Sequence, residues 1–245
     1  MNLVPFQLPF GKYELKGDSY KLSCEAIVLH GAGKSSRMRF LRLRESLNDR
    51  GIPSSSFDFI GHGETGGDIS DSTLHGRTEQ AAAVIRHTCI EPLTLVAGSM
   101  SGYTAIKLTE LFPVSNLILL VPAVYTPRAY DLSFGSEFSA AIRVPGSWQD
   151  SDAFSIMSEF KGNLLIIAAE VDDVIPTEVI ERIYASAKNT KSRHLHIVPN
   201  SKHLSLFPRE QDFLLVLNMI IEVCRNGRDN KALHGRQCRC APLPP

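Results

Sequence analysis

The sequence predicts an α/β domain with a mostly parallel central sheet and helices on both faces. Short apolar, β-like runs recur along the 245 residues with helical patterns between them, which is the alternation expected of strand–helix–strand units. Two of these runs, 117–121 and 164–167, are apolar at every position. Such strands are typical of a sheet that is covered on both faces.

The expected elements follow one another in regular order. Strands are expected at residues 26–29, 56–60, 93–96, 116–121, 163–168 and 194–198, with an antiparallel edge pair within residues 6–22. Helices are expected at residues 36–50, 77–89, 103–111, 177–187 and 211–225, where apolar residues recur at spacings of three and four. In the first helix, Phe40, Leu43 and Leu47 form the stripe expected to be buried.

One interval interrupts this order. Residues 122–161 contain prolines, glycines and aromatic residues without a simple repeat, and a stretch of this length between two core strands indicates an inserted cap or lid. Its aromatic residues pack either over a site or into a small core of the insertion itself. We therefore expect one domain at residues 1–226 with a cap at about 123–161, followed by a mobile tail at residues 227–245.

Composition and charge narrow the function classes. The chain has 26 basic and 26 acidic residues and is 43% hydrophobic, which argues against disorder, a nucleic-acid partner and attraction to anionic lipid. No apolar run approaches 18 residues, and the first 20 residues lack a signal-peptide pattern. The five cysteines form no disulfide framework, and the Cys238–Cys240 pair lacks the second pair of a metal site. We expect a cytoplasmic protein without a membrane span.

The turn at residues 97–102, Ala-Gly-Ser-Met-Ser-Gly, lies between a predicted strand and a predicted helix. A sharp strand-to-helix turn presents a serine hydroxyl at its apex and accepts only small neighbours. With Ser99 at the apex, the residues two positions away are Ala97 and Ser101, whereas Ser101 at the apex would place the bulky Tyr103 there. Ser99 is the preferred nucleophile, and a glycine- and serine-rich connection is the alternative.

A serine nucleophile requires a base and a group that orients the base. His203 follows the last predicted strand, so it can reach the carboxyl edge of the sheet, where Ser99 also lies. An acidic segment follows the strand before it, and there Asp172 is the preferred orienting acid, ahead of Asp173 and Glu170. A surface histidine and an acidic turn are the alternative interpretations.

The oxyanion of an acyl transfer needs backbone N–H donors. Met100 follows the nucleophile, and Ala32 lies in the loop after the first core strand, between glycines that allow close approach of a ligand. A phosphate-binding loop ending at Gly33-Lys34-Ser35 is the rival interpretation. The earlier glycine that it requires is replaced by Val28.

Together these features resemble the α/β-hydrolase superfamily over residues 20–225. The resemblance rests on the order Ser99, Asp172, His203, on His30-Gly31, on the loop at 58–65 and on Asp172-x-x-Ile175-Pro176. Within the superfamily, the chain is most similar to the small serine esterase, thioesterase and serine-aminopeptidase-like branch. The fold implied is an α/β-hydrolase fold with a short cap insertion.

The resemblance implies an ester or thioester hydrolase that forms an acyl-enzyme. Ser99 would be the nucleophile, His203 the general base and then acid, Asp172 the orienting acid, and Ala32 and Met100 the oxyanion donors. No metal or organic cofactor is required. The sequence departs from the usual glycines at Ala97, Ser101 and Ser201. Transfer of the acyl group to another acceptor, cleavage of an amide and a catalytically silent binding protein therefore remain open.

The expected partner is a small-molecule acyl substrate. We expect His30, Gly31, Tyr125 and Trp148 to contact it. A thioester of coenzyme A or of a carrier protein is a further expectation, because basic residues gather in and before the first helix. For Arg39, Arg42 and Arg50, a solvated helix face is the simpler interpretation. The basic residues in and before this helix are Lys34, Arg37, Arg39, Arg42, Arg44 and Arg50.

Overall fold

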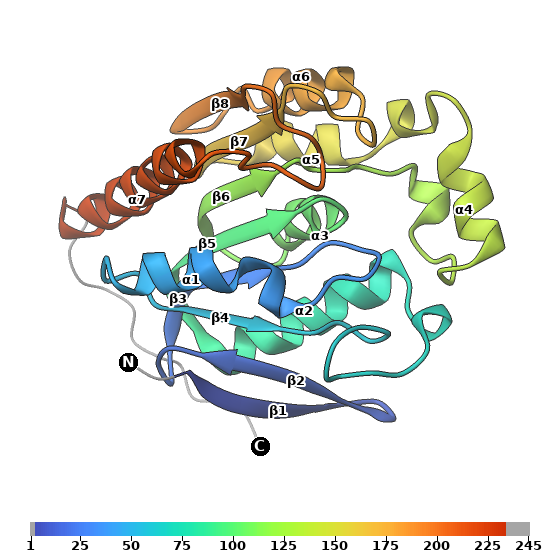
Figure 1. The fold of residues 1–245 in the computed structure, drawn as a ribbon, viewed down its shortest axis with the longest axis horizontal. Helices are drawn as coiled ribbons and strands as arrows, with labels where there is room; N and C mark the ends of the chain where they lie inside the picture. The colour runs from blue at the N-terminus through green and yellow to red at the C-terminus, as the bar shows by residue number, and fades with distance from the viewer. Residues whose placement is uncertain (1–2, 234–245) are drawn as a thin grey trace.

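The computed structural model describes residues 3–233 of the chain, and the side chains of residues 3–226. Eight strands form one sheet in the order β1-β2-β4-β3-β5-β6-β7-β8 (Figure 1). The strands are β1 (Val4–Phe10), β2 (Tyr13–Ser19), β3 (Cys24–Leu29), β4 (Ser54–Phe57), β5 (Cys89–Gly98), β6 (Val114–Leu120), β7 (Asn163–Ala169) and β8 (Ser192–Val198).

The pairing confirms the mostly parallel sheet. β1 and β2 pair antiparallel, as do β2 and β4, while every pair from β4 to β8 is parallel. The predicted edge pair is therefore present. All seven residues of β7 are buried, which explains why residues 164–169 are all apolar and do not alternate with polar residues. The parallel strands end at one edge, and in Figure 1 the arrowheads of β5 and β6 point towards the side on which α4 lies.

The long helices lie close to their predicted positions. The first predicted helix is divided into a 3-10 turn at Arg37–Phe40 and an α-helix, and the second begins earlier than expected because Thr73 caps it, accepting a hydrogen bond from Gly76 N at 2.8 Å. The helices are α1 (Leu41–Asn48), α2 (Leu74–Thr88), α3 (Ser101–Leu108), α4 (Ser136–Arg143), α5 (Ala153–Glu159), α6 (Thr177–Ser186) and α7 (Glu210–Leu233).

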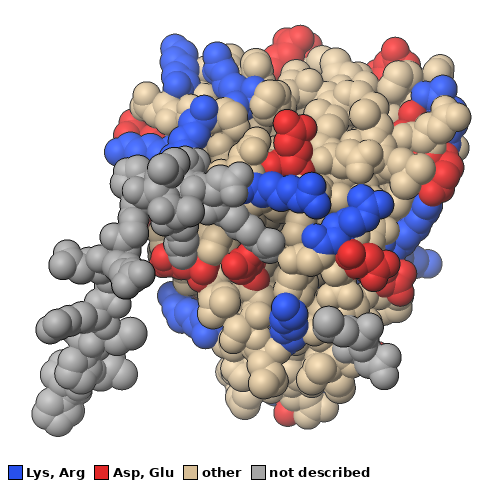
Figure 2. Space-filling view, turned by 90° about the vertical axis from the view of Figure 1, so that its left-hand side faces the viewer, with Lys and Arg blue, Asp and Glu red and all other residues tan. Residues whose placement is uncertain are grey.

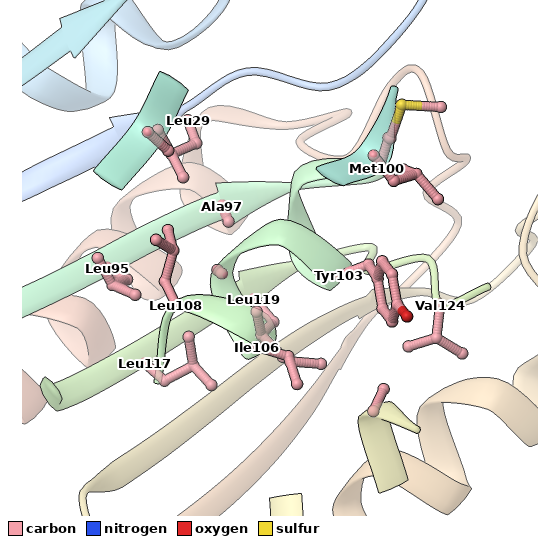
Figure 3. Close-up of a cluster of buried hydrophobic side chains, with 14 of the residues drawn as sticks. Leu29, Leu95, Ala97, Met100, Tyr103, Ile106, Leu108, Leu117, Leu119 and Val124 are labelled. Atoms are coloured by element: carbon pink, nitrogen blue, oxygen red, sulfur yellow. The ribbon is translucent and has the colours of Figure 1, made fainter. Parts of the chain in front are cut away.

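The helices form a layer on each face of the sheet, with α1 and α7 on the near face in Figure 1. One apolar core packs α1 and α7 against the sheet, and a second core packs α2, α3, α5 and α6 against the opposite face. In Figure 3, Ile106 and Leu108 of α3 lie beside Leu117 and Leu119 of β6 and Leu95 of β5. All five of these side chains are fully buried, so α3 is fixed firmly to the strands beneath it.

The interval between β6 and β7 contains short elements that the sequence pattern did not predict. It holds α4, α5 and 3-10 turns at Pro127–Ala129 and Ser147–Asp150. These elements are only three to eight residues long, too short for an apolar repeat to become recognisable in the sequence. Figure 1 shows α4 beyond the carboxyl ends of the central strands.

The last helix is longer than predicted. The sequence pattern ended it at residue 225, whereas α7 continues to Leu233, which is within the segment expected to form a tail. The rest of that segment, including Cys238 and Cys240, lies outside the described residues. A search of the described part of the chain finds no helix with the length and apolar character needed to cross a membrane.

Two of the basic residues near the first helix are buried in an ion-pair network. Arg37 donates from Nε to Asp18 Oδ2 at 2.7 Å, and its Nη1 bonds Asp58. Arg44, which is fully buried, also pairs with Asp18. Burial alone would lower the pKa of Arg37, but its hydrogen bonds to Asp18 and Glu64 and the charge of Asp58 raise it. These two arginines therefore hold β2, β4 and the segment before α1 together, and neither is free to attract a ligand.

On the side of the molecule shown in Figure 2, basic and acidic side chains are interspersed. This mixing agrees with the zero formal net charge of the whole chain. Long-range attraction by one sign of charge is therefore not a property of this face.

We predict that Arg37→Gln lowers the free energy of unfolding by about 3–5 kcal/mol, because it leaves the buried carboxylates of Asp18 and Asp58 without a cation. Arg50→Gln is the matched control, since Arg50 is exposed at the end of the same basic segment. Its expected effect is within about 0.5 kcal/mol. Urea denaturation of the two variants measures both values, and equal stabilities would contradict the structural role of Arg37.

Candidate active site

Ser99 lies at the turn between β5 and α3 in a left-handed backbone conformation, with φ of 52°. Its amide donates to Leu120 O at 2.9 Å, and its carbonyl oxygen accepts from Gly102 N at 2.8 Å and Ala123 N at 3.0 Å. These bonds tie both sides of the turn to its surroundings and hold an unfavourable conformation in place. The hydroxyl is thereby presented at the carboxyl edge of the sheet.

The close contacts at this turn fall on Gly98 and Gly102. A Cβ atom on Gly98 would lie 2.6 Å from Phe40 Cζ, and one on Gly102 would lie 2.6 Å from Pro122 Cβ. The glycines that the turn requires are therefore one position before and three positions after Ser99. This explains how Ala97 and Ser101 are tolerated at the positions where the sequence departs from the usual pattern.

Ser101 has a structural position. It is fully buried at the start of α3, and its hydroxyl donates to His30 O at 2.5 Å while accepting from Arg77 Nη2 at 2.9 Å. A hydroxyl engaged in this way is not available to a substrate. Of the two serines in the turn, Ser99 is the one that faces the histidine.

Three predicted residues from distant parts of the chain form a continuous hydrogen-bonded series. Ser99 Oγ lies 2.9 Å from His203 Nε2, and His203 Nδ1 lies 2.9 Å from Asp172 Oδ2. The other carboxylate oxygen of Asp172 accepts from Val174 N at 2.9 Å and Ile175 N at 2.8 Å. The carboxylate is thus fixed on both oxygens, and it orients the imidazole towards Ser99.

The other acidic candidates lie elsewhere. Asp173 is exposed, and Glu170 accepts a hydrogen bond from Asn200 N at 2.6 Å. Glu170 therefore braces the loop after β8 instead of contacting the ring of His203.

Ser201 joins the two loops that carry Asp172 and His203. Its hydroxyl donates to Val198 O at 2.6 Å and accepts from Glu170 N at 3.3 Å, and its carbonyl oxygen accepts from Val171 N at 2.9 Å. A glycine at this position would lack the hydroxyl bonds. The departure from the usual glycine at residue 201 thus has a local structural reason.

The loop after β3 passes very close to Ser99. A Cβ atom on Gly31 would lie 3.1 Å from Ser99 Cβ and 3.3 Å from Gly98 O, so a side chain there would push the loop away. Neither Ala32 N nor Met100 N donates to another backbone group among the turns and loops of residues 3–233. Both amides are therefore available as donors beside Ser99.

Two cavities meet at Ala32. The larger, of about 800 Å³, is lined by Ser99, His203, Gly31 and Ala32 together with basic and apolar residues. The smaller, of about 280 Å³, is lined by Ala32, Met100, Arg77 and His62, and by Phe134 and Phe138 of the segment between β6 and β7. Ser99 thus lines one cavity, and Ala32 and Met100, which carry the two free amides, line the second.

The expected substrate contacts are brought together only in part. Gly31 lines the larger cavity, but His30, Tyr125 and Trp148 line neither of the two. His30 is fully buried, with Nδ1 2.8 Å from Gly31 O and Nε2 accepting from Phe59 N at 3.3 Å. Burial and the nearby charge of Arg77 lower the pKa of His30 well below its usual value. The ring is therefore neutral and supports the loop from behind.

Sequence reasoning did not assign Arg77 or His62 to the site, and it expected Phe134 and Phe138 in the cap without selecting them as substrate contacts. Arg77 and His62 follow no motif whose spacing identifies a ligand site, and the two phenylalanines belong to the interval without a repeat. Within the described residues, no group of three or more His, Cys, Asp or Glu side chains has a geometry that could hold a metal ion.

We predict stability effects of different size for the two serines of the turn. Ser101→Ala removes one hydrogen bond to His30 and one from the buried Arg77, so it is expected to lower the free energy of unfolding by about 1–3 kcal/mol. Ser99→Ala is the matched neighbour and is expected to change it by less than about 0.5 kcal/mol. Urea denaturation measures both, and a larger loss for Ser99→Ala than for Ser101→Ala would contradict these positions.

Comparison with known protein families finds no matching family model. Among curated proteins, the uncharacterised protein YfhR of Salmonella typhi is 28% identical over 193 residues, which is 74% of this chain and 65% of YfhR. The YfhR protein of Escherichia coli K12 is 27% identical over 209 residues, or 78% of this chain and 70% of that protein. The chain thus spans only part of the length of these relatives.

Solved structures resemble the chain over most of its length. Est1E from Butyrivibrio proteoclasticus with bound ferulic acid has a TM-score of 0.70 at 17% identity, covering 91% of this chain and 99% of its own. The thioesterase domain from the curacin biosynthetic pathway has a TM-score of 0.67 at 12% identity, covering 91% and 100%. The monoacylglycerol lipase of Paleococcus ferrophilus has a TM-score of 0.67 at 19% identity, covering 87% and 99%. The chain has the fold of the α/β-hydrolase superfamily.

Proposed function

We propose that the protein is a serine hydrolase that cleaves a carboxylic ester or thioester through an acyl-enzyme intermediate. The observation that carries this proposal is the series from Ser99 to His203 to Asp172, with both hydrogen-bonding distances at 2.9 Å. The series opens into a cavity of about 800 Å³. A base within hydrogen-bonding distance of a hydroxyl, itself oriented by a carboxylate, is the arrangement that activates a serine at neutral pH.

In the first half of the reaction, Ser99 Oγ attacks the carbonyl carbon of the substrate while His203 Nε2 takes its proton. The carbonyl oxygen becomes an oxyanion, which accepts hydrogen bonds from the amides of Ala32 and Met100. Asp172 keeps the proton on Nδ1 and stabilises the imidazolium that forms. The intermediate then breaks the bond to the leaving group, which departs as an alcohol or thiol with the proton from His203.

In the second half, water replaces the leaving group. His203 takes a proton from this water, whose oxygen attacks the acyl carbon, and the same two amides hold the second oxyanion. Breaking the bond to Ser99 Oγ releases the carboxylic acid and returns the proton to the serine. In each half of the reaction, His203 Nε2 therefore takes one proton and gives it back.

We also propose that residues 123–161 act as a cap on a single domain formed by residues 1–226. Phe134 and Phe138 support this role because they belong to this segment and line the cavity on the side of Ala32 and Met100. Apolar walls of this kind exclude water from a bound acyl group.

A thioester substrate is the more specific version of this proposal. Lys34, Arg39 and Arg42 line the larger cavity with Ser99, and cations there favour a phosphate-bearing leaving group such as that of coenzyme A or a carrier protein. Arg42 already pairs with Glu210, while Arg39 donates to Leu204 O at 2.5 Å. Of the basic residues in this region, Lys34 is therefore the best placed to meet such a group.

We predict that Ser99→Ala lowers kcat by about 10⁴- to 10⁶-fold, because no other group supplies the nucleophile. The measurement compares esters of graded acyl length with the matching coenzyme A thioesters. Ser155→Ala, which alters an exposed serine on α5, is expected to leave both activities unchanged. Labelling of the wild type by a fluorophosphonate probe, followed by peptide mapping, identifies the reacting serine. A wild-type protein that is neither labelled at Ser99 nor able to turn over any substrate would indicate a binding protein instead.

We predict that Asp172→Asn lowers kcat by about 10⁴-fold while Asp173→Asn has little effect. The amide cannot stabilise the imidazolium and favours the wrong tautomer of His203, whereas Asp173 is an exposed neighbour with no contact to the ring. Steady-state kinetics on the best ester from the series above measures both. A loss at Asp173 equal to that at Asp172 would rule out this assignment of the acid.

A further inference from the structure

Arg77 on α2 is a buried cation without a carboxylate partner. The residue is fully buried, and among the described residues no Asp or Glu side chain forms an ion pair with it. Arg37 and Arg44, the other buried arginines, each pair with Asp18. Burying a charge without a partner is costly, so the state of Arg77 requires an explanation.

Only part of the Arg77 guanidinium has a structural role. Its Nη2 donates to His30 O at 2.8 Å, Gly31 O at 3.3 Å and Ser101 Oγ at 2.9 Å. These bonds fix the loop that carries Ala32 to the start of α3. Nε and Nη1 are buried and have no hydrogen-bond partner. One nitrogen therefore accounts for the structural bonds, and two N–H-bearing nitrogens remain unused.

Burial lowers the pKa of Arg77 to about 9, so the group remains charged at neutral pH. Its plane lies on an aromatic ring, with Cζ 3.6 Å from the centre of the Phe59 ring, and this contact offsets part of the cost of burial. An aromatic face does not replace a hydrogen-bond acceptor. A negatively charged acceptor would therefore satisfy both the charge and the free nitrogens.

The residue that carries these unused nitrogens lines the smaller cavity. Arg77 lines this space of about 280 Å³ with His62, whose Nε2 is likewise buried without a partner. Burial and Arg77 lower the pKa of His62, so its ring is neutral and Arg77 supplies the charge. Phe134, Phe138 and Met100 form apolar walls. The cavity thus combines an apolar lining with one cation.

The position of this cavity relates it to the acyl group. Ala32 lines both cavities, and the smaller one lies on the side of the two amides proposed to hold the oxyanion. An acyl group bound to Ser99 with its oxygen at these amides can extend into this space. The far end of a short acyl chain would then approach Arg77.

We propose that Arg77 binds a carboxylate at the far end of the acyl group, so that the substrates are half-esters or half-thioesters of short dicarboxylic acids. This proposal rests on the proposed function for the identity of the reacting serine. Its observable consequence is charge recognition, which can be measured without turnover.

The test uses Ser99→Ala protein, in which the ester is bound but not cleaved. Isothermal titration calorimetry compares the monomethyl esters of succinic, glutaric and adipic acids with methyl butanoate, pentanoate and hexanoate, which replace the carboxylate by a methyl group. At least one half-ester is expected to bind about tenfold or more tightly than its neutral counterpart, as for a hydrogen bond to a charged group. Equal affinities within all three pairs would overturn the proposal.

A second substitution tests whether Arg77 is responsible. Arg77→Gln in the Ser99→Ala background is expected to make the half-ester bind no more tightly than its neutral counterpart, so that the ratio of the two affinities is close to one. Arg86→Gln, at an exposed position on the same helix, is expected to leave this ratio unchanged. Loosening of the Ala32 loop would weaken the binding of both ligands of a pair. The ratio of their affinities therefore reports the recognition of the charge alone. If Arg77→Gln does not unfold cooperatively, Arg77→Lys replaces it and is expected to reduce the ratio. A ratio unchanged by the Arg77 substitution would overturn the proposal.

The two proposals can fail separately. Selective binding of the half-esters without turnover and without labelling of Ser99 would contradict the proposed function and support the carboxylate site. Equal cleavage of neutral esters and half-esters, with no selectivity in binding, would support the proposed function and contradict the carboxylate site.

Discussion

The left-handed turn at Ser99 is the constraint on which the site depends. A non-glycine residue at φ 52° is strained by about 1–3 kcal/mol, and it persists because β5 and α3 are fixed on either side. Ile106 and Leu108 anchor α3 in the core, while Ser99 itself bonds to Leu120 at the end of β6 and to Ala123 beyond it. The packing energy of two elements thus holds one hydroxyl in place. The small residues around the turn are a consequence of this close packing.

The molecule treats its buried arginines in two different ways. Arg37 and Arg44 share Asp18, and Arg37 also pairs with Asp58, so their charges are balanced within the fold. Among the described residues, the partners of Arg77 are all neutral: three oxygen acceptors and an aromatic ring. The first arrangement connects strands near the edge of the sheet, and its charges need no further partner. The second leaves a buried positive charge at the smaller cavity, which also contacts Ala32 and Met100.

The sequence predicted the features that depend on local pattern. The apolar strands, the order of the elements and the turn at Ser99 all follow from short stretches of chain, and Asp172 and His203 were selected because parallel strands end at one edge. Other features depend on tertiary packing. The sequence grouped Arg37 with the basic residues near the first helix and did not indicate its burial, because the carboxylates that neutralise it come from β2 and the segment after β4. Tyr125 and Trp148 were expected at the substrate, whereas Phe134 and Phe138 line the cavity, because no periodicity indicated how residues 122–161 fold.

The position of Arg77 connects structure, charge and chemistry through a single side chain. Its Nη2 holds the carbonyl oxygens of His30 and Gly31, immediately before the Ala32 amide. An anion bound at its other nitrogens would compensate the buried charge and thereby favour the conformation in which this loop contacts α3. A substrate carboxylate would in this way stabilise the same loop that we propose donates to the oxyanion. A neutral acyl chain would fill the apolar part of the cavity but leave the charge unpaired, so discrimination between the two follows from the absence of a counter-ion among the described residues around Arg77.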